Sequence, residues 1–131
     1  MMLELHAMEL YDVLAKFLPA GWERLALFGQ VDGGAYEFTF YVRQKGSSQY
    51  QQCYAMARAG QFPRIKLLNA FDDLYEVCRT AKRELKEKEP GLREWTRFTF
   101  VIDQEGSFSV DYEYGDMIAG VPQAWKDRYL V

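Results

Sequence analysis

The strongest constraint on the fold is a pair of alternating segments joined by a two-glycine turn. Large apolar residues occupy every second position of the segment 35–42, which is the period of a strand with one buried face. These residues are Tyr36, Phe38, Phe40 and Val42. The segment 22–31 alternates in the same way, and Asp32-Gly33-Gly34 lies between the two. Glycine readily adopts the positive φ of a tight turn, so the sequence predicts an antiparallel hairpin here.

Six further elements follow from periodicity and from glycine and proline positions. Helices are predicted from about Leu3 to Leu18, from Ile65 or Asn69 to Lys88, and from Pro122 onward; strands are predicted at Gln49–Met56, Thr96–Asp103 and Ser107–Tyr114. The order is α-β-β-β-α-β-β-α. In the long helix we expect a buried stripe formed by Leu68, Phe71, Leu74, Tyr75, Cys78, Ala81 and Leu85.

This order predicts one α+β domain over residues 1–131, with an antiparallel five-stranded sheet packed by helices on one side. The chain has 131 residues, of which 49% are hydrophobic and 16% aromatic, enough for a sizeable core. We expect Trp95, Trp125 and Phe98 to share that core with the long helix.

Charge and composition limit the class of partner. The formal net charge is −3, which argues against nucleic acid as a direct ligand because phosphate binding needs a cationic face. No apolar run is long enough to span a membrane, and the first residues lack the pattern of a signal peptide. We therefore expect a cytoplasmic protein without a membrane partner, in which Cys53 and Cys78 are buried, reduced thiols.

Catalytic residues are hard to find. His6 is the only histidine, and near a fraying terminus we expect it at the surface. Cys53 and Cys78 lack an activating base and sit in no metal-binding motif. The glycines between 29 and 34 join two strands, whereas a phosphate loop opens a helix. The sequence predicts no enzyme, no cofactor, no metal site and no catalytic residue.

The side chains best suited to bind a metal ion or a partner are acidic. Asp111 and Glu113 lie two apart on a predicted strand, so their carboxylates share a face, and Asp103 and Glu105 flank the preceding turn. Three interpretations remain open: a solvated sheet face, an anionic patch for a cationic protein partner, or a divalent-metal site. Tyr41 is expected on the exposed face of its strand, where tyrosine is a typical interface residue. We take these five residues as candidates for partner binding.

Several segments also match a known family in order and spacing. They are Leu18-Pro19-Ala20-Gly21-Trp22, Phe38-Thr39-Phe40-Tyr41, Trp95-Thr96, the run from Gly106 to Tyr114, and Trp125-Lys126 with Tyr129-Leu130. In these features the whole chain resembles the YezG-like family of small bacterial immunity proteins. The stretch Met117-Ile118-Ala119-Gly120 is less acidic than the resemblance leads us to expect, which argues against toxin contacts in that loop.

The resemblance implies an immunity protein, or antitoxin, that binds and neutralises the C-terminal toxic domain of a secreted toxin, often a nuclease, without a cofactor. It leaves open whether the protein is a monomer or a homodimer. Two alternatives are kept. A type III-like secretion chaperone has the same order of elements, although the pattern of Trp22, Trp95 and Trp125 does not match that group. A small metal-dependent enzyme rests on the acidic strand alone.

Overall fold

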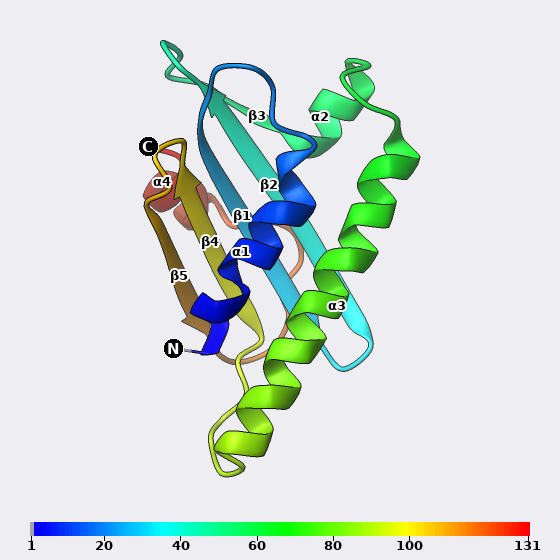
Figure 1. The fold of residues 1–131 in the computed structure, drawn as a ribbon, viewed down its shortest axis with the longest axis vertical. Helices are drawn as coiled ribbons and strands as arrows, with labels where there is room; N and C mark the ends of the chain where they lie inside the picture. The colour runs from blue at the N-terminus through cyan, green and yellow to red at the C-terminus, as the bar shows by residue number, and fades with distance from the viewer. Residues whose placement is uncertain (1) are drawn as a thin grey trace.

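The computed structural model describes residues 2–131. Its elements, in chain order, are α1 (Met2–Ala15), β1 (Trp22–Asp32), β2 (Ala35–Gln44), β3 (Tyr50–Gln52), α2 (Cys53–Arg58), α3 (Arg64–Lys88), β4 (Arg97–Asp103), β5 (Phe108–Glu113) and α4 (Gln123–Tyr129) (Figure 1). The five strands form one antiparallel sheet in the order β3-β2-β1-β4-β5. The predicted α+β class, five-stranded sheet and order of elements are confirmed, with the short helix α2 as an addition.

The first predicted hairpin is present. Asp32 pairs with Ala35, which leaves Gly33 and Gly34 as the two turn residues, and Gly33 has a φ of 60°. That left-handed conformation costs glycine little, because it has no Cβ to clash with the neighbouring carbonyl. β1 therefore lies at the centre of the sheet, paired with β2 on one side and β4 on the other.

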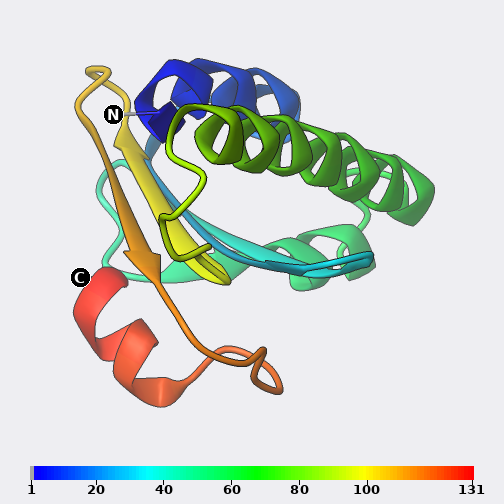
Figure 2. The same cartoon turned by 90° about the horizontal axis from the view of Figure 1, so that it is seen from below.

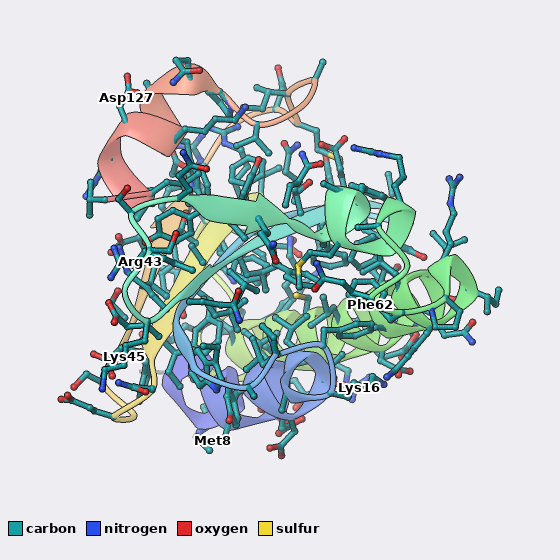
Figure 3. All side chains as sticks on the ribbon, turned by 90° about the horizontal axis from the view of Figure 1, so that it is seen from above. Met8, Lys16, Arg43, Lys45, Phe62 and Asp127 are labelled. Carbon is teal, nitrogen blue, oxygen red and sulfur yellow. The ribbon has the colours of Figure 1, made fainter. Side chains whose placement is uncertain are left out.

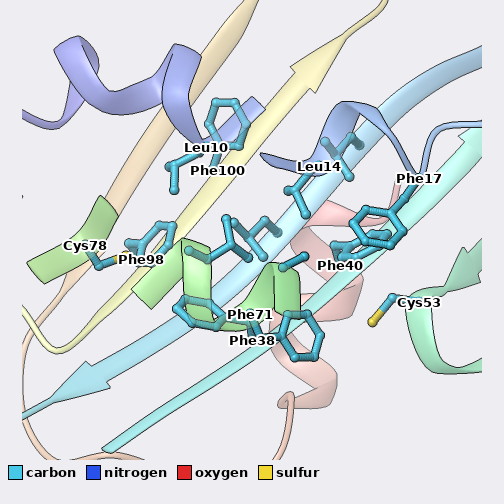
Figure 4. Close-up of a cluster of buried hydrophobic side chains, with 14 of the residues drawn as sticks. Leu10, Leu14, Phe17, Phe38, Phe40, Cys53, Phe71, Cys78, Phe98 and Phe100 are labelled. Carbon is cyan, nitrogen blue, oxygen red and sulfur yellow. The ribbon is translucent and has the colours of Figure 1, made fainter. Parts of the chain in front are cut away.

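The main core lies between one face of the sheet and the helices α1 and α3, which run across that face (Figure 2). Figure 4 shows how aromatic rings of β2 and β4 meet Leu10 and Leu14 of α1 there. Its fully buried side chains include Leu10, Leu14, Leu25, Leu27, Phe38, Phe40, Phe98 and Phe100. The alternation predicted for β1 and β2 therefore points the expected residues into the core.

The prediction that the helices lie on one side of the sheet is wrong. α4 packs on the opposite face, so that Asp127 and Met8 lie on opposite sides of the sheet (Figures 2 and 3). Trp125 consequently belongs to a second, smaller cluster, whereas Trp95 and Phe98 lie in the main core. The physical reason is a continuous apolar run, Leu25-Ala26-Leu27-Phe28, which makes both faces of β1 apolar and requires a cover on each.

The third predicted strand, Gln49–Met56, is shorter than expected. β3 ends at Gln52, and the next six residues form α2. Cys53 and Met56 explain the change, since both are buried in the main core. They would point to opposite faces of a strand, but at a spacing of three they share one side of a helix.

α3 also differs in detail from its prediction. It begins at Arg64 after Pro63 as the N-cap residue, so Asn69 lies inside the helix. Leu67, and not Leu68, is the first leucine of the buried stripe, while Leu68 is 39% exposed. From Phe71 onward the predicted Leu74, Cys78 and Ala81 are buried as expected.

The prediction that His6 lies at the surface is wrong. Its side chain is buried between α1 and α3. Nδ1 lies 3.2 Å from Oε1 of Glu9, and Nε2 lies 2.9 Å from Oε2 of Glu84. Nε2 therefore links α1 to α3 through Glu84, while Nδ1 contacts Glu9 one turn further along α1.

Candidate partner-binding face

Four of the five candidate residues lie on the face of the sheet that carries α4, and Glu105 lies in the β4–β5 turn. Trp125 anchors this helix. Its ring lies 5.5 Å from that of Phe28 and 5.6 Å from that of Tyr41, and its indole Nε1 donates a 2.7 Å hydrogen bond to Oγ1 of Thr99. Aromatic packing and a satisfied indole donor together fix the position of α4 on the sheet.

Tyr41 lies underneath this helix, so the expectation that it is exposed is wrong. Only 5% of its surface is accessible, and burial raises the pKa of its phenol. Alternation placed Tyr41 on the correct face of β2, but that face is covered here by Trp125. Tyr41 therefore packs under α4 and offers no ring to solvent.

Asp111 and Glu113 project from β5 on the same face, beside α4. Their side chains are 47% and 53% exposed. Oδ2 of Asp111 accepts a 2.7 Å hydrogen bond from the hydroxyl of Tyr129 and lies 4.0 Å from Nη2 of Arg128. Glu113 lies 4.0 Å from Nη2 of Arg97. Asp111 thus helps to hold α4, while Glu113 has only a long, partly exposed ion pair.

The pKa of Tyr129 is shifted by its burial and by its contact with Asp111. Burial, followed by the hydrogen bond to the Asp111 carboxylate, raises the pKa of Tyr129 to about 12. A depression of about 400 Å³ lies alongside, between α4 and the β4–β5 hairpin. Its wall carries both signs of charge and the aromatic edge of Trp125. Charged and aromatic groups therefore line the same depression.

Asp103 and Glu105 lie at the other end of the hairpin. Oδ1 of Asp103 accepts hydrogen bonds from the main-chain N–H groups of Glu105 (2.9 Å) and Ser107 (3.1 Å). Asp103 therefore shapes the turn, as aspartate commonly does at such positions. This leaves Glu105 exposed at the tip of the hairpin.

A second groove, of about 560 Å³, opens next to this turn. Asp103, Glu105 and Glu23 supply acidic groups to its lining, and Arg24 and Arg43 supply basic ones. The two arginines already have partners: both donate to the main-chain oxygen of Val131, at 3.4 and 2.5 Å, and Arg43 also donates to Oε1 of Glu23 at 2.6 Å. The groove is therefore lined by charges of both signs, and its arginines already have hydrogen-bond partners.

The structure thus brings four of the five candidates together on one hairpin. We call Asp103, Glu105, Asp111 and Glu113 the acidic group; Asp103 and Glu105 lie at the β4–β5 turn, and Asp111 and Glu113 lie along β5. All four lie on the α4 side or at the tip, and the side-chain carboxylates of two of them, Glu105 and Glu113, accept no hydrogen bond among those described. Tyr41 is separated from them by Trp125 and α4.

Family comparison gives this face its context. The family model described as "Immunity protein YezG-like" matches residues 4–130. The chain belongs to this family. The match covers every strand, so the acidic group and α4 both lie within the family domain.

Two relatives agree with this assignment. "Immunity protein YezG" of Bacillus spizizenii is 26% identical over 117 residues, which cover 85% of this chain and 70% of the relative. "Immunity protein YezG" of Bacillus subtilis is 24% identical over 120 residues, which cover 85% of this chain and 75% of the relative. The resemblance read from the sequence is therefore confirmed.

Sequence reasoning missed two residues that shape this face of the family domain. The side-chain amide of Gln30 is fully buried and forms two 2.8 Å hydrogen bonds with the main chain of Ile118, one as donor and one as acceptor. Arg97 donates to the main-chain oxygens of Tyr114 and Asp116. Together they hold the loop 114–122 that leads into α4. The only sequence signal was a glutamine inside an otherwise apolar strand.

The described residues carry little that resembles catalytic chemistry. Cys53 and Cys78 are free, buried thiols, and burial raises their pKa values to about 11 and about 12. Among the side chains that the structure describes, those of residues 6–131, no group of three or more His, Cys, Asp or Glu is placed to hold a metal ion. In that same range, no helix is long and apolar enough to cross a membrane.

Proposed function

We propose that this protein is an immunity protein that binds and neutralises the toxic domain of a secreted nuclease, using the acidic group as part of its contact surface. The observation that carries the proposal is the family match over residues 4–130. The acidic group supports the choice of partner, because a nuclease must be cationic around its substrate groove. An anionic surface on the inhibitor then speeds association and favours the correct orientation.

The contribution of the negative charges to toxin binding is best tested at Glu105 and Glu113. Both are exposed, whereas Asp103 and Asp111 also hold the turn and α4. We expect Glu105→Lys combined with Glu113→Lys to slow association with the cognate toxin domain by about tenfold at low salt, and by less at high salt. Stopped-flow binding at two salt concentrations measures the effect, and survival of cells that co-express the toxin measures protection.

A matched control lies on the opposite layer of the molecule. Asp12→Lys combined with Glu87→Lys changes the net charge by the same amount, at exposed positions of α1 and α3. This pair should leave the association rate close to that of the unmodified protein. Equal slowing by both pairs would mean that only net charge matters. Full protection and salt-independent binding by the Glu105→Lys, Glu113→Lys protein would remove the acidic group from the contact surface.

We further propose that the protein acts by binding alone. The only imidazole is held between Glu9 and Glu84, and the buried thiols of Cys53 and Cys78 have raised pKa values, so neither is prepared as a nucleophile or base. Purified protein should show no nuclease or hydrolase turnover with or without added Mg²⁺ or Mn²⁺. Metal-dependent turnover that disappears in an Asp111→Ala, Glu113→Ala protein would contradict this proposal.

A further inference from the structure

One of the two edges of the sheet is formed by β5. Within residues 2–131, β5 is bonded to β4 alone and has no neighbouring strand on its other side. The main-chain N–H of Asp103 bonds to the main-chain oxygen of Ser107 across the hairpin. In an antiparallel pair the bonding residues alternate, so the main-chain groups of Phe108 and Val110 point away from β4. They form a row of donors and acceptors along the outer edge.

This edge lacks most of the features that usually prevent a further strand from pairing, and its only charged side chains are Asp111 and Glu113. Natural edge strands are commonly very short, bulged, or interrupted by proline or lysine. The opposite edge follows that rule, because β3 has only three residues and continues directly as α2. β5 has six residues in regular register with β4, and the segment 107–114 contains no proline, lysine or arginine. Of the two edge strands, β5 is the longer one, and it offers six residues in regular register for a partner strand.

The side chains along β5 specify the chemistry of such a strand. On the α1–α3 side, Phe108 is 42% exposed and Val110 is half-buried against the main core. On the α4 side, Asp111 and Glu113 present carboxylates two residues apart. Side chains of neighbouring strands meet on the same face. A complementary strand therefore alternates apolar residues on the core side with lysine or arginine on the α4 side.

We propose that β5 binds an extended segment of the toxin as a sixth strand of the sheet, and that this segment alternates basic and apolar residues. The identity of the partner rests on the proposed function, whereas the β5 edge does not. A second copy of this chain fits the edge less well, because pairing of β5 with β5 would place four carboxylates on one face of the joint sheet. In strand addition the main-chain bonds provide affinity and the alternating side chains provide specificity.

Amide hydrogen exchange, resolved by residue with NMR, tests the geometry directly. In the free protein the amides of Phe108 and Val110 should exchange quickly, while those of Ser109 and Asp111, which point toward β4, should be protected already. Binding of the toxin domain, inactivated by mutation of its own active site, should slow exchange at Phe108 and Val110 by at least about a hundredfold. Complex formation with no added protection at these two amides would overturn the proposed strand addition and leave the proposed function standing.

A pair of variants at one position gives a second test. Val110→Pro removes the outward N–H, and proline is tolerated at an edge position whose N–H faces away from the ladder. Val110→Ala makes a comparable reduction in packing but keeps the N–H. We expect Val110→Pro to bind the toxin domain at least about tenfold more weakly than Val110→Ala. Equal affinities would overturn the proposal, and if Val110→Pro fails to fold, the exchange measurement decides.

Two further outcomes separate the proposals from each other. If the free protein gains protection at Phe108 and Val110 as its own concentration rises, the occupant is a second copy and the toxin segment is excluded. If the toxin domain does not bind at all, the proposed function fails and the strand addition fails with it. Binding with unchanged exchange at the β5 edge is the result that removes the strand addition alone.

Discussion

Trp125 shows how one side chain can determine the position of an element. It is the only residue of α4 that is buried, and it contacts both Phe28 and Tyr41 while donating to Thr99. A seven-residue helix has little stability of its own, because helix nucleation is unfavourable and few hydrogen bonds follow it. The docking of α4 therefore depends on this one indole more than on helix propensity.

We expect Trp125→Ala to lower the free energy of unfolding by about 3–5 kcal/mol, the usual cost of removing a large aromatic side chain from a packed site. Trp125→Phe retains much of the apolar area but leaves the buried hydroxyl of Thr99 without its donor, so it should cost less, about 1–3 kcal/mol. Urea denaturation followed by far-UV circular dichroism measures both values. An unchanged midpoint for Trp125→Ala would mean that α4 contributes nothing to stability.

Single residues also mark the limit of prediction from sequence. Alternation assigned Tyr41 to the correct face of β2, but exposure depends on what covers that face, and the covering residue Trp125 is 84 positions further along the chain. The prediction that His6 is exposed was wrong for the same reason, since its partner Glu84 lies 78 positions away along the chain. The acidic residues on the β4–β5 hairpin were easier to place, because a short hairpin brings its own residues together.

At the scale of elements, strands with a regular period and glycine turns were predictable. β1, β2, β4 and β5 lie where alternation placed them, because one face of each packs on a large core. The segment 49–56 was less predictable, since its glutamines and tyrosines alternate weakly while Ala55, Met56 and Ala57 favour a helix. Burial of Cys53 and Met56 on one side decides between the two.

The sequence contains enough information to predict the side of the sheet on which α4 packs. The run from Leu25 to Phe28 is apolar at four consecutive positions, which is typical of a strand buried on both faces. A second cover was therefore required, and the terminal helix with Trp125 is the segment available for it. The path of the loop 114–122, which leads to α4, could not be predicted from the sequence. Its position depends on hydrogen bonds from the side chains of Gln30 and Arg97 to main-chain groups of the loop.

The whole molecule consists of a sheet with two unequal covers. The α1–α3 layer buries an extended core, and within it Lys82 adds hydrogen bonds to the main-chain oxygens of Val31 (3.0 Å) and Trp95 (2.6 Å). The α4 layer has a much smaller hydrophobic cluster, whose buried residues are Ala26, Phe28, Tyr41 and Trp125. The proposed contact surface lies on the side of the smaller cover. Adjustment of α4 to a partner would therefore leave the large core intact.

This inequality predicts two levels of stability. We expect the amides of α4 to exchange through a local opening whose free energy lies below that of global unfolding, because the α1–α3 core persists when α4 detaches. The amides of Leu27 in β1 and Phe100 in β4 should exchange only through global unfolding, since they lie in the centre of the sheet. Native-state hydrogen exchange at increasing denaturant concentrations measures both.

In Trp125→Phe the opening free energy of α4 should fall, while exchange at Leu27 and Phe100 keeps its steep dependence on denaturant. If α4 and the central strands share one opening free energy, the two layers unfold as a single unit, and a partner that binds over α4 meets a rigid surface.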